Sequence, residues 1–216
     1  MEQSDTFIIA KEGWKFLLGS IGAFILFILI DMSLLQFVAF GAIIAFVYIY
    51  RNPERIVPYY QDHSIVAVAD GRVRSIETVD NCPMLDGPCY KVEIVSGMFD
   101  TSLLRAPFEA TAATVELFRG TRLPVMQPLA SSLNERAVVR FDDAQGESCI
   151  VEHMLDQSID ALSLNVRETH KLPQGGRYGL MVRGTHTLYL PTESRVAVKV
   201  GEEVRAGESL IGYFSK

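Results

Sequence analysis

Hydrophobic residues are spread unevenly along the chain of 216 residues. Two long apolar runs lie near its beginning, at positions 16–30 and 34–50, and the short segment 31–33, which begins with Asp31, separates them. A helix that spans a membrane needs about 20 apolar residues, within a range of about 17–25. The second run meets this length narrowly, and the first meets it when Trp14 and Lys15 count as its interfacial end. The pattern therefore predicts two short membrane spans joined by a tight turn.

Basic residues flank this apolar block. Lys11 and Lys15 precede the first run, Arg51 and Arg55 follow the second, and the turn between the runs carries neither Lys nor Arg. By the positive-inside rule, both ends of the hairpin and the domain that follows should lie on the cytoplasmic side of the cell (inner) membrane. Run length alone leaves two alternatives open, a re-entrant hairpin and a buried helix pair in a soluble protein.

After position 50 the pattern changes to short β-like runs that are separated by turn residues. The runs lie at 65–69, 72–79, 90–96, 111–118, 137–141, 148–154, 178–182, 187–190 and 195–198. Regular short strands with Asp-Gly and Gly turns between them indicate an antiparallel sandwich or barrel. We therefore predict a mainly β protein preceded by an α-helical membrane hairpin. The expected organisation is an N-terminal cytoplasmic segment at 1–15, the hairpin at 16–50, a linker at 51–63 and the β domain at 64–216.

Near the C-terminus, segment 198–212 carries two turn glycines, Gly201 and Gly207, with apolar residues between and after them. This spacing predicts a β-hairpin and resembles the glycine hairpins of biotinyl- and lipoyl-type barrels. The lysine context needed for attaching such a cofactor is absent. A membrane-tethered binding module is therefore the weakest of the functional hypotheses.

Composition and charge narrow the function further. Hydrophobic residues make up 49% of the chain, concentrated in the first block, and the net charge of −6 without any Lys/Arg run argues against a nucleic-acid partner. Cys82 and Cys89 are too far apart for a CxxC motif, and Cys149 makes the total odd. We therefore expect three ordinary reduced thiols, no metal site and a reducing, cytoplasmic compartment.

Seven short segments, read in order, carry a resemblance to a known family. They are AKEGW at 10–14, YRNPER at 50–55, VADGRV at 68–73, FD at 99–100 with RAP at 105–107, ASSLNER at 130–136, YGLMVRGT at 178–185, and the glycine hairpin near position 200. In this order and spacing the chain resembles the short phosphatidylserine decarboxylases of bacteria and archaea over nearly its whole length. The resemblance implies a carboxy-lyase of phospholipid biosynthesis, phosphatidylserine as substrate, a phospholipid membrane as partner, and a homodimer.

The resemblance also implies a prosthetic group made from the chain itself. Such proenzymes cut themselves at a Gly–Ser bond, and the serine becomes a pyruvoyl group whose ketone binds the substrate amine and accepts the electron pair released with carbon dioxide. Here the cut would fall between Gly184 and Thr185. A threonine hydroxyl is a known nucleophile, although its β-branch restricts χ1, and it would leave a 2-oxobutyryl instead of a pyruvoyl group.

Other family positions suggest the remaining site residues. Asp70 matches the aspartate that supports self-cleavage, whereas the family histidine falls at Ser102, whose hydroxyl does not titrate near neutral pH and cannot act as an acid or base. His186 is the histidine that the sequence places at the reacting centre, either as a substitute proton carrier or as an ordinary strand residue. Arg105 and Arg136 are able to bind a phosphate or carboxylate, with local pairing as the alternative.

These residues support two hypotheses of different kinds. The first is a membrane-anchored phosphatidylserine decarboxylase that processes itself at Gly184–Thr185. The second is a non-catalytic relative that keeps the fold and binds lipid or a partner. The changes at Ser102 and Thr185 alter two core roles at once, and they are what separates the two hypotheses.

Overall fold

The computed structural model describes residues 8–60, 62–82, 85 and 87–215, so the first seven residues of the predicted N-terminal segment and residue 61 of the predicted linker lie outside it. The chain forms two compact units, Met1–Glu54 and Arg55–Lys216. The first is helical and the second is built of strands.

The helical unit is a pair of α-helices. A short 3-10 turn, η1 (Lys11–Gly13), leads into α1 (Trp14–Leu29), and α2 (Ser33–Ile49) follows. The turn between the helices places Asp31 at a φ of +54°, a left-handed conformation that aspartate tolerates better than most residues. These bounds confirm the helix pair and the turn that the two apolar runs predict.

Aromatic contacts hold the open end of the helix pair together. The Phe16 ring stacks on the rings of Phe46 and Tyr50, with centroids 5.2 and 5.5 Å apart. At Gly13 the backbone passes so close to Tyr50 that a Cβ there would lie 2.5 Å from the Tyr50 Cβ. Glycine is therefore required at this position for α1 to pack against the end of α2.

The outer surface of the helix pair is as apolar as its contact surface. Its exposed large apolar side chains include Leu18, Ile25, Leu26, Leu29, Leu34, Phe37, Val38 and Ile44. Helices that are hydrophobic all round belong in a large core or a membrane. By length and composition, the stretch Lys11–Leu29 is able to cross a membrane, and Ser33–Ile49 is a shorter apolar helix.

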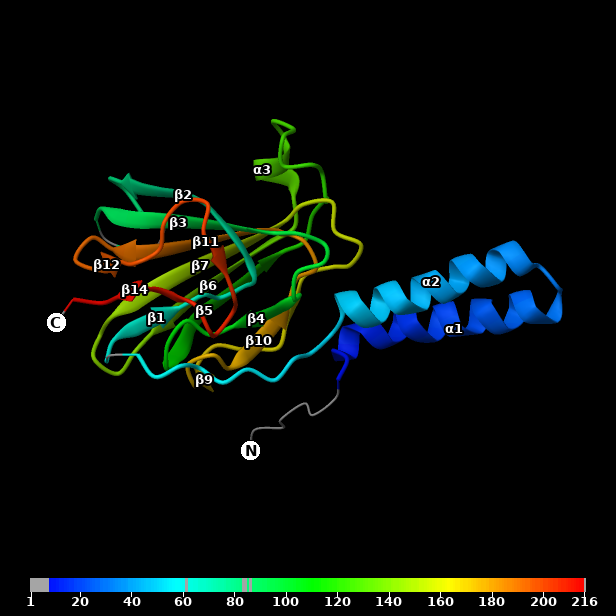
Figure 1. The fold of residues 1–216 in the computed structure, drawn as a ribbon. Coiled ribbons are helices and arrows are strands. Elements are labelled where there is room, and N and C mark those ends of the chain that lie inside the picture. Colours follow the sequence, from blue (N-terminus) through cyan, green and yellow to red (C-terminus); the bar gives the residue numbers. More distant parts are fainter. Residues whose placement is uncertain (1–7, 61, 83–84, 86, 216) are drawn as a thin grey trace. The chain divides into compact units, whose positions relative to one another are not determined.

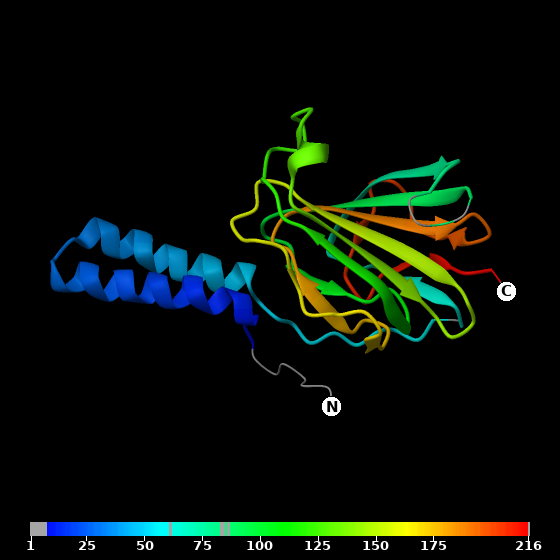
Figure 2. The ribbon, with the colours of Figure 1, turned by 180° about the vertical axis from the view of Figure 1, so that it is seen from behind.

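Antiparallel sheets form the second unit (Figures 1 and 2). The largest has eight strands in the order β13 (Glu203–Val204), β2 (Gly71–Val79), β3 (Cys89–Ser96), β11 (Gly184–Pro191), β7 (Ser148–Leu155), β6 (Arg136–Asp142), β5 (Ala110–Phe118) and β9 (Lys171–Leu172). One three-stranded sheet has the order β1 (Ser64–Val66), β14 (Leu210–Tyr213), β12 (Arg195–Val196). The other has the order β4 (Leu103–Arg105), β10 (Arg177–Leu180), β8 (Ser163–Leu164), and a single helical turn, α3 (Ala130–Leu133), precedes β6.

One apolar core joins the three sheets. It includes Ile65 from β1, Leu104 from β4 and Val151 from β7, all of them buried. Along β6 the burial alternates at every residue, so that one face of the strand lines this core and the other does not. The mainly β, antiparallel architecture predicted from the alternating pattern is thus confirmed.

Two details of the strands differ from the predicted pattern. β11 begins at Gly184, before the predicted run at 187–190, because its first residues pair with β3 and β7 although two of them are polar. In the C-terminal segment Gly201 and Gly207 have left-handed φ values of +88° and +74°, as their predicted turns require. β12 and β14 pair with each other, whereas β13 between them pairs with β2. The likeness to a biotinyl-type barrel stays a prediction.

Candidate functional site

The predicted cleavage point lies at the start of β11, between β3 and β7 in the large sheet. Thr185 is paired with Val95 on one side and Met154 on the other. At Gly184 an added Cβ would lie 2.2 Å from the Met154 carbonyl oxygen. The residue before the predicted cut therefore has to be glycine for the strands to approach this closely.

The hydroxyl of Thr185 is buried and has no hydrogen-bond partner in the part of the chain that the structure describes. The residue is 5% exposed, and within the described residues its Oγ1 makes no hydrogen bond. A buried hydroxyl in this state loses the hydrogen bonds that water would give it, at a cost of about 1–3 kcal/mol. Such an unsatisfied group calls for an explanation, and an oxygen left free to attack the neighbouring Gly184 carbonyl is one.

Thr185 and His186 point to opposite faces of the sheet because they are consecutive in a strand. Thr185 shares its face with Met154 and Arg136, which lie directly across the neighbouring strands. His186 shares the core face with His153 and is 0% exposed. The structure thus separates His186 from the Thr185 hydroxyl, although the two residues are adjacent in sequence.

Asp70 lies immediately before β2, and within the described residues its carboxylate accepts four hydrogen bonds, three of them from Arg55 and Ala206. Its Oδ1 accepts from the Arg55 guanidinium and from the Ala206 N–H at 2.8 Å, and its Oδ2 accepts from Arg55 at 2.7 Å. Burial alone would raise the pKa of this carboxyl, but Arg55 and the Ala206 N–H outweigh it and hold the pKa below its usual range. Asp70 is therefore a fixed negative charge and a weak base.

The segment that contains Ser102, at the position where the family has a histidine, lies next to Asp70. The Thr101 N–H faces Asp70 Oδ2 at 3.4 Å, and Thr101 Oγ1 accepts a hydrogen bond from Arg55. Ser102 itself is 2% exposed, and its carbonyl accepts from the Met181 N–H. Through Thr101, the structure thus places Asp70 next to the segment that contains Ser102.

A buried chain of hydrogen-bonded polar side chains lies on the core face of β11, the strand that begins at the predicted cut. His186 Nε2 lies 2.8 Å from Ser96 Oγ, and Ser96 in turn hydrogen-bonds to the Asp70 carbonyl. His186 Nδ1 lies 2.7 Å from His153 Nδ1, and His153 Nε2 lies 2.6 Å from the Tyr178 hydroxyl. The chain links the core directly to the backbone of Asp70.

The Asp70 carbonyl, at the end of this chain, determines which atoms donate and which accept. A carbonyl only accepts, so Ser96 donates to Asp70 and must accept from the Nε2–H of His186. The Nδ1 of His186 then accepts from the Nδ1–H of His153, whose Nε2 accepts from the Tyr178 hydroxyl. With both imidazoles neutral, each hydrogen in this chain has one position.

The pKa values of these groups agree with a neutral chain. Burial lowers the pKa of His186 to about 3, although the charge of Asp70 partly opposes this. Burial and the neighbouring His186 hold the pKa of His153 well below its usual range, and burial raises that of Tyr178. No motif spacing marks Ser96 or His153, so sequence reasoning missed both. Tyr178 begins the YGLMVRGT segment, but the motif gave its side chain no role.

The two arginines proposed for substrate binding lie in different sheets. Arg136 begins β6, on the face that Thr185 shares, with its guanidinium 4.9 Å from the centre of the Phe118 ring. Arg105 is in β4 and 5% exposed, and it donates to the Gly175 carbonyl at 2.9 Å. The structure therefore separates the two arginines, and the burial of Arg105 favours a structural role.

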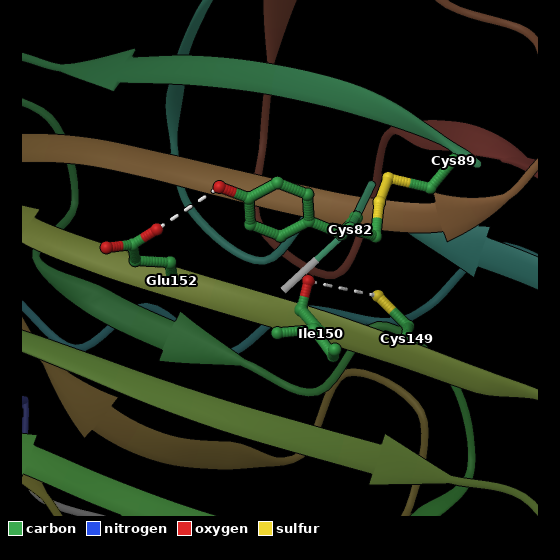
Figure 3. The surroundings of a disulfide bond; sticks show 6 residues. Cys82, Cys89, Cys149, Ile150 and Glu152 are labelled. Carbon is green, nitrogen blue, oxygen red and sulfur yellow. Dashed lines mark hydrogen bonds between the residues drawn. A yellow bond between two sulfur atoms is a disulfide. The ribbon is translucent and has the colours of Figure 1, made fainter. Parts of the chain in front are cut away.

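The expectation of three free thiols is wrong for two of them. Cys82 and Cys89 form a disulfide that closes the connection between β2 and β3 (Figure 3). Cys89 begins β3 and Cys82 lies in the connection before it, with Cα atoms 6.0 Å apart, a pairing that a search for CxxC spacing does not detect. Cys149 is free and buried, and burial raises its pKa. The cysteines therefore no longer argue for a reducing compartment.

Comparison with known proteins places this architecture in a family. The family model for phosphatidylserine decarboxylase matches residues 43–212. A phosphatidylserine decarboxylase proenzyme of Syntrophus aciditrophicus is 28% identical over 212 residues, which are 97% of this chain and 99% of that protein. One of Burkholderia lata, with the same name, is 30% identical over 207 residues, 94% of this chain and 95% of that protein.

The chain belongs to the phosphatidylserine decarboxylase family. Family membership implies decarboxylation in phospholipid biosynthesis, with phosphatidylserine as substrate. The word proenzyme in the names of its relatives is consistent with a prosthetic group formed by processing.

Proposed function

We propose that this chain is a membrane-bound phosphatidylserine decarboxylase proenzyme that cuts itself between Gly184 and Thr185. The observation that carries the proposal is the Thr185 hydroxyl, which is buried, has no hydrogen-bond partner among the described residues and follows a glycine. A threonine hydroxyl at this position is able to attack the carbonyl of the residue before it. The names of the relatives, which describe proenzymes, support processing of this kind.

The proposed cut proceeds through an ester, an elimination and a hydrolysis. Thr185 Oγ attacks the Gly184 carbonyl carbon, the peptide C–N bond breaks, and the chain is held by an ester. Loss of the Thr185 α-proton then breaks the Cβ–O bond, which releases Gly184 as a carboxylate and leaves an unsaturated N-terminus. Water replaces its nitrogen, which leaves as ammonia, and a 2-oxobutyryl group forms at residue 185. When present, this ketone supplies the electron sink for decarboxylation.

Asp70 and Arg136 take supporting roles in this proposal. The ionised Asp70, held by Arg55 and Ala206, stabilises positive charge near the site and does not shuttle protons. Arg136, on the same face as Thr185, binds the phosphate or carboxylate of the lipid headgroup. His186 lies on the core face and reaches the backbone of Asp70 by hydrogen bonds through Ser96.

We infer a membrane hairpin from the helical unit. Its all-round apolar surface, the span Lys11–Leu29 and the basic residues at both of its ends support insertion with both ends toward the cytoplasm. A phospholipid substrate makes such an anchor useful because the headgroup lies at the bilayer surface. The homodimer implied by the family resemblance stays a prediction.

A second candidate function is a non-catalytic relative. It is favoured by Ser102, which offers no titratable group where the family has histidine, and by the tight clamp on Asp70. In this case the fold is kept for binding lipid or a partner, and the chain stays intact.

Intact-mass analysis of the full chain purified from membranes tests the proposal. The expected result is two fragments, one ending at Gly184 and one beginning at residue 185 with a blocked keto N-terminus. Thr185→Ala should give one full-length mass, whereas Thr185→Ser should also give two fragments, the second with a prosthetic group one methylene lighter. A single full-length mass for the natural chain contradicts the proposal.

If the natural chain is not cut and the double change Thr185→Ser and Ser102→His then restores cleavage, the chain is a decayed enzyme on an intact fold.

A further inference from the structure

The connection between β5 and β6 exposes an unusual number of apolar side chains. We call residues 117–134 the β5–β6 tip; it contains α3, which stands out from the large sheet in both views (Figures 1 and 2). Its exposed large apolar side chains are Leu117, Phe118, Met126, Leu129 and Leu133, with Met126 97% exposed. A soluble surface seldom gathers this many without a partner.

The charge of the tip is opposite to that of the protein. The chain as a whole carries a net charge of −6, but the tip contains two arginines, Arg119 and Arg122, and no acidic residue. Both arginines contact the carboxylate of Glu135, whose side chain is 4% exposed and lies beneath them. The Arg119 side chain is 60% exposed, so positive charge reaches the surface while the compensating negative charge is buried.

The tip is anchored to the end of β7, which pairs with the start of β11, where the predicted cut lies. The Asn134 side chain binds both backbone groups of Leu123, at 2.7 and 2.8 Å, and donates to the Leu155 carbonyl at 2.8 Å. Leu155 is the cross-strand partner of Gly184. Arg136, which follows the tip, lies on the same sheet face as Thr185. A ligand held at the tip is therefore held next to the cleavage strand.

We propose that the β5–β6 tip inserts into the headgroup layer of a bilayer that contains anionic phospholipid. Met126, Leu129 and Leu133 enter the interface, and Arg119 meets lipid phosphate and carboxylate groups. Exposed apolar side chains flanked by basic ones, in a segment without acids, have the chemistry that binds such surfaces. The choice of phosphatidylserine as the anionic lipid rests on the proposed function. The tip would thus present the substrate headgroup to Thr185 and Arg136.

The test uses the full chain reconstituted in vesicles. Met126→Cys is labelled with an environment-sensitive fluorophore, and Gln145→Cys is the matched control, exposed in the turn at the opposite end of β6. The disulfide stays intact and Cys149 is buried, so the label attaches at the new cysteine alone. Vesicles of phosphatidylcholine, with or without phosphatidylserine, carry nitroxide-labelled lipids as quenchers.

We expect a blue shift and strong quenching at position 126 but not at 145, increasing with the phosphatidylserine fraction and decreasing with salt. Equal quenching at the two positions, or no dependence on phosphatidylserine, overturns the proposal. A shift that follows the protein-to-lipid ratio and not the lipid charge would mean that a second copy covers the tip, and it also overturns the proposal.

Variants of Arg119 separate the effect of its charge on insertion from an effect on the stability of the fold. Arg119→Gln should lower the inserted fraction roughly fivefold, while Arg119→Lys, which keeps the charge, should not. Similar losses in both variants would contradict a role for the charge.

The fluorescence measurement does not depend on cleavage, and repeating it in Thr185→Ala keeps its result distinct from that of the processing test. An uncut chain with an inserted tip would contradict only the proposed function, and a cut chain without insertion only this inference.

Discussion

The two ends of strand β11 lie in one sheet but are held by different physical means. At the first end, His186 belongs to a buried chain of directional hydrogen bonds that reaches Asp70 through Ser96. At the other end, Tyr189 packs in a small cluster with Ile150 and the Cys82–Cys89 disulfide (Figure 3). The end with the predicted cut is thus ordered by hydrogen bonds, and the distant end by a covalent bond and apolar contacts.

This difference bears on how the site is positioned. A fully satisfied polar chain admits one arrangement of donors and acceptors, and it loses much when one member is removed. Apolar contacts are less directional and tolerate small changes of shape. A site that must align a hydroxyl with one carbonyl benefits from the first kind of support.

The largest effect should come from breaking the polar chain. His186→Leu leaves the Nδ1–H of His153 without an acceptor and Ser96 Oγ without a donor. Unsatisfied buried groups cost about 1–3 kcal/mol each, so we expect a loss of about 4 kcal/mol in the free energy of unfolding. Chemical denaturation of the full chain in detergent measures this. A loss below about 1 kcal/mol would show that the chain is not a supporting element.

The next effect comes from the covalent end. Reducing the Cys82–Cys89 disulfide frees a short loop, and chain entropy predicts a loss of about 2.5 kcal/mol. The same denaturation, with and without reductant, gives the value. A double Cys82→Ala, Cys89→Ala variant is the control, since reductant should not affect it. If reductant does not change the natural chain, the disulfide is not formed or not stabilising.

Acid should weaken the cleavage end first. The pKa of His186 is about 3 in the folded state, against an ordinary value of 6.5, so the unfolded state binds more protons between these values. Stability is full above pH 6.5 and falls as the pH drops through this window, by about 2 kcal/mol from pH 7 to pH 5 for this residue. His153 acts in the same direction, and Asp70, with its lowered pKa, loses its contribution only at lower pH. His186→Leu should reduce the slope; an unchanged slope would assign it elsewhere.

The smallest effect is expected at Tyr189. Tyr189→Phe removes one hydrogen bond to Glu152 at 3.2 Å while keeping the ring in its cluster. Because Glu152 is not fully buried, it regains water, and the loss should be below about 1 kcal/mol. A loss as large as that of His186→Leu would remove the distinction between the two ends.

Much of the fold is predictable from local patterns. The two apolar runs predict the helix pair, and alternation along segments such as 137–141 predicts strands, because burial of one face depends on side-chain period. The short strands β4, β8 and β9 were not predicted, since two or three residues carry no period and pair only because longer strands place them.

The candidate site divides in a similar way. Short motifs identified Asp70, Gly184, Thr185 and the Ser102 position, and the structure places Asp70 next to the segment that carries Ser102. No local pattern indicated Ser96 or His153, or that Tyr178 joins them, because the three residues come from three different strands. Sequence adjacency also misled for His186, which faces away from Thr185.

The sequence by itself determined the apolar helix pair, the antiparallel β unit, the family and the bond at which a cut is predicted, because these depend on residue type and order along the chain. Only the tertiary structure decided which cysteines pair, which sheet face each site residue occupies, and that two buried histidines connect the core to Asp70. Those properties depend on strand register, which is set by packing between segments far apart in the chain.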